Sequence, residues 1–211
     1  MGGMTSSVAA KLVFFPPSPP SYKVVTDKVT GLLLLASLPH RENVEIHKLQ
    51  TRRGTEIMAM YVRHPMANST IIYSHGNAAD LGQMYELLTK YPPRWMYTLY
   101  PIRALHCQCL FDRPVENNTY ADIEAVYKCL EETYGSKQDD VILYGQSVGS
   151  GPTLDLASRL PLLRAGVLHS PILSGLRVMY AVKKTYWFDI YKNRQNHICG
   201  LPNSHHSWDC G

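Results

Sequence analysis

The stretch that decides the fold is Asp140-Val141-Ile142-Leu143-Tyr144-Gly145-Gln146-Ser147-Val148-Gly149. Its first half is a continuous apolar run, which is typical of a buried strand in a parallel sheet. Its second half has the pattern G-x-S-x-G, in which the small residues Gly145 and Gly149 let a strand and a helix approach each other closely. A helix-like stretch follows as far as Leu160. Strand, motif and helix in this order predict a sharp turn that lifts the Ser147 hydroxyl above the sheet.

The segments on either side of this stretch predict an α/β architecture. Alternation with period two over 44–49 and 56–63 predicts an opening hairpin. Short apolar runs at 69–75 and 165–169 predict buried strands, and helical spacing predicts helices over the ranges 81–91 and 119–133. Strands that alternate with helices form a mostly parallel sheet flanked by helices, which is therefore the expected fold class.

The loop after the predicted strand at 69–75 lies where a serine hydrolase needs a second backbone donor. A serine nucleophile needs two backbone N–H groups to stabilise the oxyanion, one from the residue after the serine and one from the loop after an earlier strand. The first is Val148, and the loop is His75-Gly76-Asn77-Ala78, with the donor expected near Asn77. The alternative is that Ser147 is only a helix N-cap and that the glycines are turn residues. The strand, loop and helix order favours the nucleophile.

Composition excludes several classes of protein. The chain has 211 residues, is 45% hydrophobic and carries a net charge of +4, with its charges scattered rather than gathered into a stripe. We therefore expect one globular domain without nucleic-acid partners. An odd number of cysteines without a signal peptide indicates free thiols in a reducing compartment. The longest apolar run, 31–38, is too short to span a membrane. No cofactor or metal is expected.

The N-terminal arm carries a candidate lipidation site. The start Met1-Gly2-Gly3-Met4-Thr5-Ser6 fits the pattern for acylation of Gly2 after removal of the methionine. A single acyl chain gives marginal, reversible binding, so we expect a peripheral protein on cytosolic faces of the plasma membrane or endosomes that is also partly cytosolic. The run PPSPPS at 16–21 is an extended connector. Residues 1–22 therefore form an arm ahead of the domain.

Four strings resemble the α/β-hydrolase domain-containing protein 17 family, in a plant-like version. They are SHGNAADLGQM (74–84), NNTYADIEA (117–125), ILYGQSVGSGPTLDLASR (142–159) and VLHSPILSGLRV (167–178). The resemblance implies an α/β-hydrolase fold and a membrane-associated serine hydrolase that removes palmitate from protein cysteines. It implies Ser147 as the nucleophile, with acylated proteins as the substrate class. Animal members carry an N-terminal cysteine cluster that this chain lacks, so Gly2 would be the anchor.

Two blocks depart from the family pattern within the domain expected over 23–192. Block 91–115 has four prolines and three arginines where relatives have a strand and a loop rich in glycine and tyrosine, so this strand is in doubt. The tail 193–211 replaces the segment that should carry the triad aspartate. Acid and histidine follow the serine in this fold. We therefore expect an incomplete sheet that lacks its last strands and a triad that lacks both partners.

Substitutes for the missing partners have simpler explanations. His169 ends a strand within the family's HSP motif and is interpreted as structural, and neither Asp155 nor Asp189 is a good triad acid. The tail offers imidazole and thiol groups, but without the paired spacing of a zinc site. The residues are His197, Cys199, His205, His206 and Cys210.

We interpret the tail 193–211 as a frameshifted reading of a normal hydrolase message. Permitted codons, read one nucleotide along, allow TDKITFVVFPILIIHGTAD, a strand followed by the loop that carries the acid in the family. Trp208 has a single codon, which with the first base of Asp209 forces the glycine of that loop. Three classes stay open: an active thioesterase, a non-catalytic membrane-tethered fragment, and an unstable product of an aberrant transcript.

Overall fold

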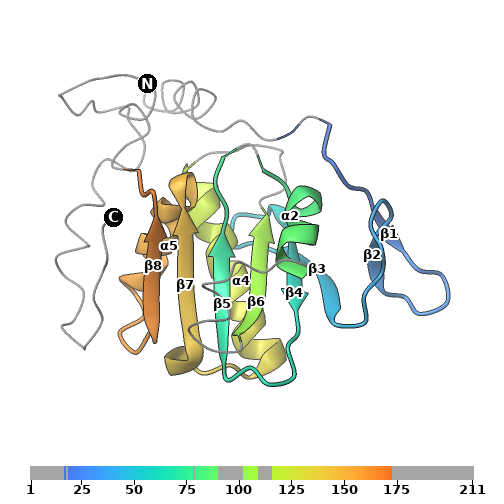
Figure 1. The fold of residues 1–211 in the computed structure, drawn as a ribbon. Coiled ribbons are helices and arrows are strands. Elements are labelled where there is room, and N and C mark those ends of the chain that lie inside the picture. Colours follow the sequence, from blue (N-terminus) through green and yellow to red (C-terminus); the bar gives the residue numbers. More distant parts are fainter. Residues whose placement is uncertain (1–16, 18, 78, 90–101, 109–115, 173–211) are drawn as a thin grey trace.

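The computed structural model describes residues 17, 19–77, 79–89, 102–108 and 116–172, with only the backbone described over 102–108 (Figure 1). In chain order its elements are β1 (Val24–Thr26), β2 (Leu33–Leu35), β3 (Val44–Gln50), β4 (Glu56–Val62), β5 (Ser69–Ser74), α2 (Leu81–Thr89), β6 (Ile102–Gln108), α4 (Glu116–Tyr134), the 3-10 turn η1 (Gln138–Asp140), β7 (Val141–Gln146), the 3-10 turn η2 (Ser147–Gly149), α5 (Ser150–Ala157) and β8 (Ala165–His169).

A six-stranded sheet in the order β3-β4-β6-β5-β7-β8 is the centre of the described structure. Strands β6, β5, β7 and β8 are parallel to one another, whereas β3 and β4 form an antiparallel hairpin and β4 pairs antiparallel with β6. Helix α2 covers one face of this sheet and helices α4 and α5 cover the other (Figure 1). The chain therefore has an α/β-hydrolase fold, with a mostly parallel sheet flanked by helices.

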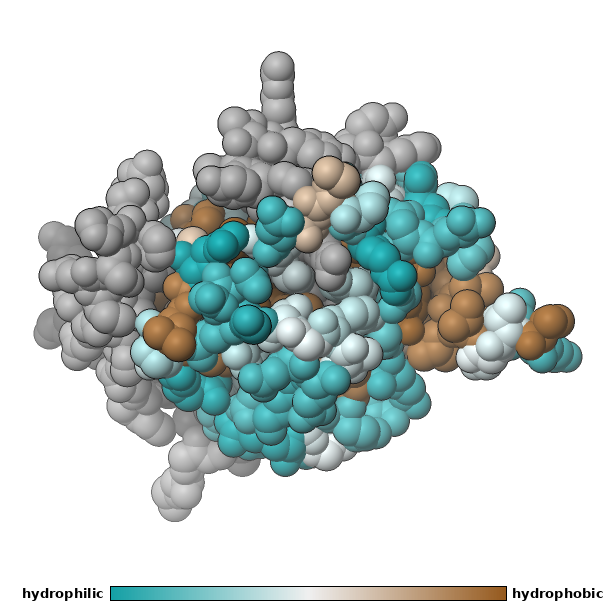
Figure 2. Space-filling view, turned by 90° about the horizontal axis from the view of Figure 1, so that it is seen from below, coloured by the Kyte–Doolittle hydropathy of each residue, from teal (hydrophilic) through white to brown (hydrophobic). Residues whose placement is uncertain are grey.

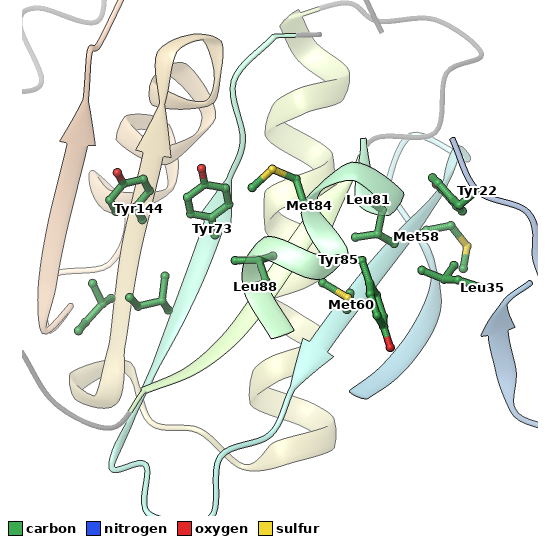
Figure 3. Close-up of a cluster of buried hydrophobic side chains, with 12 residues drawn as sticks. Tyr22, Leu35, Met58, Met60, Tyr73, Leu81, Met84, Tyr85, Leu88 and Tyr144 are labelled. Carbon is green, nitrogen blue, oxygen red and sulfur yellow. The ribbon is translucent and has the colours of Figure 1, made fainter. Parts of the chain in front are cut away.

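Alternation along the strands divides the core into two layers. In β7, Ile142 and Tyr144 pack on the α2 side, whereas Val141 and Leu143 pack under α4 and α5. This alternation follows from the strand period of two, which sends successive side chains to opposite faces. Figure 3 shows the α2 layer, in which Leu81, Met84, Tyr85 and Leu88 meet side chains of β4, β5 and β7. Both faces of β7 are thus buried, as its continuous apolar run predicts.

Most predicted elements are confirmed. The hairpin β3–β4, the strands β5, β7 and β8, and the helices α2, α4 and α5 all lie where periodicity places them. Two features differ from expectation. A strand, β6, forms inside the divergent block 91–115 and is inserted between β4 and β5. A separate two-stranded sheet, β1–β2, was not foreseen. The limits proposed for the arm, the domain and the tail stay predictions.

Candidate active site

The serine of the motif lies on a strained turn at the end of a parallel strand. Strand β7 ends at Gln146, and Ser147 begins the turn η2 with φ of +51°. A non-glycine residue in this left-handed region is uncommon and costs about 1–3 kcal/mol, so it persists only where the surrounding structure fixes it. Helix α5 starts directly after the turn, at Ser150. This is the strand, turn and helix geometry that the motif requires.

The two glycines of the motif are required by close backbone packing. A Cβ atom on Gly149 would lie 2.2 Å from the backbone oxygen of Ser74 and 2.9 Å from that of His75. A Cβ on Gly145 would lie 2.8 Å from the backbone oxygen of Gly149 and 2.6 Å from the Thr153 hydroxyl. Neither distance is compatible with a side chain. The end of β5, the end of β7 and the start of α5 therefore pack against one another at these residues.

The loop after β5 lies beside the serine. A Cβ on Gly76 would lie 3.5 Å from the Ser147 Cβ and 3.6 Å from the Gln146 Cγ. Asn77 follows and is exposed, whereas Val148 is half-buried in η2. The structure thus brings the loop of Asn77 and the turn of Val148 to one end of the sheet. Their roles as oxyanion donors stay predictions.

Two tyrosines that no motif in the sequence indicates support the strand ends beneath the serine. The Tyr73 hydroxyl donates to the Gln146 Oε1 at 2.5 Å, and the Tyr144 hydroxyl lies 2.9 Å from the His169 Nδ1. The two phenol rings stack with centroids 4.9 Å apart. Desolvation raises the pKa of Tyr73 to about 12, so its hydroxyl stays a donor at neutral pH. In Figure 3 both hydroxyls point toward the ends of β5 and β7.

Asp80 fixes the other side of the loop. Its buried carboxylate accepts from the backbone N–H of Gln83 at 2.9 Å, which caps α2, and from the backbone N–H of Ser21 at 2.6 Å. Burial disfavours the charged carboxylate, but the hydrogen bonds from Ser21 and from the helix start prevail, so the pKa of Asp80 is lowered. An aspartate directly before a helical segment is an N-cap signal that could have identified this residue. Asp80 thereby connects the end of the N-terminal arm to the loop.

No described residue completes a triad with Ser147. Among the described residues, none is hydrogen-bonded to its side-chain oxygen; the Ser150 hydroxyl and backbone N–H both donate to the Ser147 backbone oxygen instead. His169 pairs with Tyr144, and Asp155 pairs with Arg159 at 2.9 Å. Gly2, Asp189 and the tail lie outside the described residues. The described segments thus hold the turn of Ser147 and the loop of Asn77, but no base paired with the serine.

Other kinds of site are not found in the described part of the chain. Histidine, cysteine and acidic side chains do not gather there into a group that could hold a metal ion. No described helix is long and apolar enough to cross a membrane. A cavity of about 160 Å³ lies between β2, the start of β3 and Tyr85 of α2, and no residue of the Ser147 turn lines it.

Known proteins resemble this chain in sequence over most of its length, although no family model matches it. It is 36% identical over 197 residues to "Alpha/beta hydrolase domain-containing protein 17B" of Homo sapiens, an alignment that covers 88% of this chain and 68% of the human protein. It is 39% identical over 190 residues to "Alpha/beta hydrolase domain-containing protein aho-3" of Caenorhabditis elegans. That alignment covers 86% of this chain and 56% of the nematode protein.

Solved structures share the fold at lower identity. An esterase of Pyrococcus furiosus, Pf2001, superposes with a TM-score of 0.53 at 18% identity and covers 75% of this chain and 67% of its own. An alpha-beta hydrolase of Vibrio vulnificus gives a TM-score of 0.52 at 18% identity, over 68% of this chain and 51% of its own. These likenesses concern the fold alone. The sequence relationship is closer, and by it the chain belongs to the α/β-hydrolase domain-containing protein 17 family.

Proposed function

We propose that the chain is a serine hydrolase of the palmitoyl-protein thioesterase type, with acylated proteins as substrates and Ser147 as the nucleophile. The Ser147 oxygen attacks the thioester carbonyl, the C–S bond breaks, and the cysteine sulfur leaves and takes up a proton. Water then hydrolyses the serine ester, which releases the fatty acid and restores the hydroxyl. The N–H groups of Asn77 and Val148 stabilise the oxyanion in both steps.

One observation carries this proposal. Ser147 is held at φ of +51° at the end of a parallel strand, directly against the Gly76 loop. A helix N-cap requires no such strain, because cap residues have ordinary extended backbone. Backbone strain that packing fixes is concentrated at functional sites. The turn therefore favours a nucleophile over the alternative that Ser147 only caps a helix.

This chain is proposed to be a weak enzyme. A serine without a paired base loses most of its nucleophilic advantage, and catalysis then comes from substrate binding and the oxyanion hole alone. The second candidate is a non-catalytic or unstable fragment. That candidate is favoured by the half-buried side chains of β8, which is the edge strand of the described sheet. An edge strand with apolar side chains, where it stays unpaired, destabilises a sheet protein and promotes aggregation.

Labelling by a fluorophosphonate probe tests the nucleophile. We expect slow labelling of the chain, loss of labelling in Ser147→Ala, and unchanged labelling in Ser158→Ala, an exposed serine of the same region. Turnover of a palmitoyl thioester should be far slower than that of a complete relative. Activity equal to a complete relative that depends on Ser147 would overturn the claim of weakness. Labelling that persists in Ser147→Ala would overturn the nucleophile.

We also propose that the chain lies on cytosolic membrane faces through an acyl group on Gly2. One such chain binds marginally, so cell fractionation should find the protein in both membrane and soluble fractions. Gly2→Ala should shift the membrane fraction toward the soluble one. Unchanged partitioning of Gly2→Ala would show that Gly2 is not the anchor.

A further inference from the structure

The β1–β2 hairpin exposes apolar side chains that the core does not use. Val29 is 93% exposed and Leu32 is 55% exposed, both in the loop that joins the strands. In β1 itself, Val24 and Val25 are also exposed. Large exposed hydrophobic residues are normal when scattered singly, but a contiguous group marks an interaction surface. We call residues 24–32 the apolar tip.

Hydrogen bonds within the loop fix the conformation of the apolar tip. The Asp27 Oδ1 accepts from the backbone N–H groups of Val29 at 2.9 Å and Thr30 at 2.7 Å, and from the Thr30 hydroxyl at 2.9 Å. The backbone N–H of Asp27 donates to the Leu32 oxygen at 2.8 Å, and Gly31 closes the turn at φ of +72°. This network holds the Val29 side chain in solvent. Its exposure is therefore a property of the folded loop.

The hairpin stands beside the main sheet and is attached to it by one side. Leu35 of β2 and the preceding Tyr22 are buried in the α2 layer of the core. Strand β1 is exposed along its length, and the pair lies beyond β3 (Figure 1). Figure 2 shows hydrophobic surface on the part that projects from the molecule, next to a largely hydrophilic body. The cavity of about 160 Å³, lined by Val25, Leu33 and other aliphatic residues, continues this apolar surface inward.

The charged residues of the hairpin indicate an anionic surface as the partner of the apolar tip. Lys23 precedes the exposed Val24, Lys28 precedes the exposed Val29, and both lysines are exposed. The one acid of the hairpin, Asp27, already accepts three hydrogen bonds within the loop. A small aliphatic tip with cationic side chains beside it fits the interface of an anionic bilayer, where apolar groups enter the acyl boundary and lysines meet the headgroups.

We propose that the apolar tip is a membrane-docking element that inserts Val29 and Leu32 into anionic lipid surfaces. A single acyl chain does not hold a protein stably on a membrane, so a second contact on the same chain is needed. Gly2 lies about 20 residues before the hairpin, a length of chain that in extended form reaches tens of ångströms. Both contacts can therefore engage one surface. The proposal does not rest on the activity of Ser147.

Vesicle binding by the full chain with Gly2→Ala tests the tip without any acyl group. We expect cosedimentation with vesicles of phosphatidylcholine and phosphatidylserine in a 70:30 ratio. Val29→Asp with Leu32→Asp should lower the partition coefficient at least tenfold, because two aliphatic contacts are lost. The matched control, Met66→Asp with Leu162→Asp, removes side chains that are 71% and 69% exposed outside the hairpin and should change binding less than twofold. Circular dichroism should show that all variants are folded.

A second pair of variants tests the charge. Lys23→Gln with Lys28→Gln should weaken binding about fivefold per lysine on the anionic vesicles, because each lysine gains favourable energy at an anionic surface. On pure phosphatidylcholine this pair should have no effect. Absent binding by the parent, equal binding by the hairpin variant, or equal losses in hairpin and control variants would each overturn the proposal. Ser147→Ala should bind as the parent does, so this result is independent of the proposed hydrolase.

Discussion

The turn at Ser147 and the loop at Gly31 use the same left-handed backbone for different reasons. Ser147 has φ of +51° and is surrounded by the packed ends of β5, β7 and α5, whereas Gly31 has φ of +72° and nothing within 4 Å of where its Cβ would lie. At Gly31 the chain needs only a turn, and glycine supplies it without steric cost. At Ser147 the chain keeps a side chain despite the cost. Packing therefore holds a strained backbone at Ser147, where a side chain is needed, and leaves the unstrained solution to glycine at Gly31.

Gly149→Ala is the change with the largest expected effect. Its methyl group would lie 2.2 Å from the Ser74 oxygen, so backbone of β5 or α5 must move. Overpacking of this kind costs up to about 3 kcal/mol in the free energy of unfolding, which we expect here because the obstacle is backbone. Gly31→Ala, in open space, should cost only about 1 kcal/mol. Urea denaturation of both variants measures the difference.

Equal losses of unfolding free energy in Gly149→Ala and Gly31→Ala would contradict the difference in packing between the two turns. They would mean that the ends of β5 and β7 are not held as closely as their distances indicate. Probe labelling at Ser147 adds a second measure. Gly149→Ala should also slow labelling, because the loop of His75 and Asn77 must shift with the displaced backbone, whereas Gly31→Ala should leave labelling unchanged.

Ser147→Gly tests the strain itself. Glycine adopts positive φ freely, so this variant should be more stable than Ser147→Ala by about 1 kcal/mol, after allowance for the greater unfolded-state entropy of glycine. Thermal or urea unfolding of the two variants is the measurement, and both should lose probe labelling. If Ser147→Gly is no more stable than Ser147→Ala, the turn holds little strain and the argument from backbone geometry loses its support.

The two regions also differ in how well the sequence predicts them. The apolar run and motif at 140–149 predict β7 and the turn because burial and close packing leave a local pattern. The β1–β2 hairpin has strands of three residues, too short for a period to show. Strand β6 lies between β4 and β5, and pairing partners so far apart in sequence leave no local signal. Sequence patterns therefore predict where a strand or helix lies better than they predict which strands pair with each other in the sheet.

The same limit applies to the site. Ser147 and its glycines follow from the motif, but the partner of Gln146 is Tyr73, 73 residues earlier. Asp80 likewise holds Ser21 across 59 residues. These contacts depend on which strand ends meet, and no spacing in the sequence encodes them. The N-cap signal could identify Asp80 itself, but the contacts of Tyr73 and Asp80 are found only in the folded structure.

Tyr73→Phe tests one of these supports. The change removes the hydrogen bond to the Gln146 side chain, which lies against the Gly76 loop, and should cost about 0.5 to 1 kcal/mol in the free energy of unfolding. Labelling at Ser147 should slow several-fold. Tyr144→Phe is the matched control on the stacked ring, and its partner His169 is exposed, so its losses should be smaller. If Tyr144→Phe loses more stability and more labelling than Tyr73→Phe, then Tyr144 is the main support of the Ser147 turn.

The smallest expected effect is a pH dependence from His75, in the loop beside Ser147. Desolvation lowers the pKa of this imidazole, although its hydrogen bond to the Gly76 oxygen and the nearby Asp80 carboxylate oppose the shift. The unfolded chain binds a proton near pH 6.5, about the usual histidine value, whereas the folded chain binds it only at lower pH. Stability from this group is thus full above that value and is lost as pH falls toward the folded pKa.

Urea unfolding between pH 7.5 and 5.5 measures this slope. His75→Gln should flatten it, because the neutral amide takes up no proton in either state. A slope that is the same in the parent and in His75→Gln would place the pH dependence elsewhere, for example at His47, whose pKa burial also lowers. A flattened slope in His75→Gln would show that the imidazole in the loop beside Ser147 is held away from water in the folded chain.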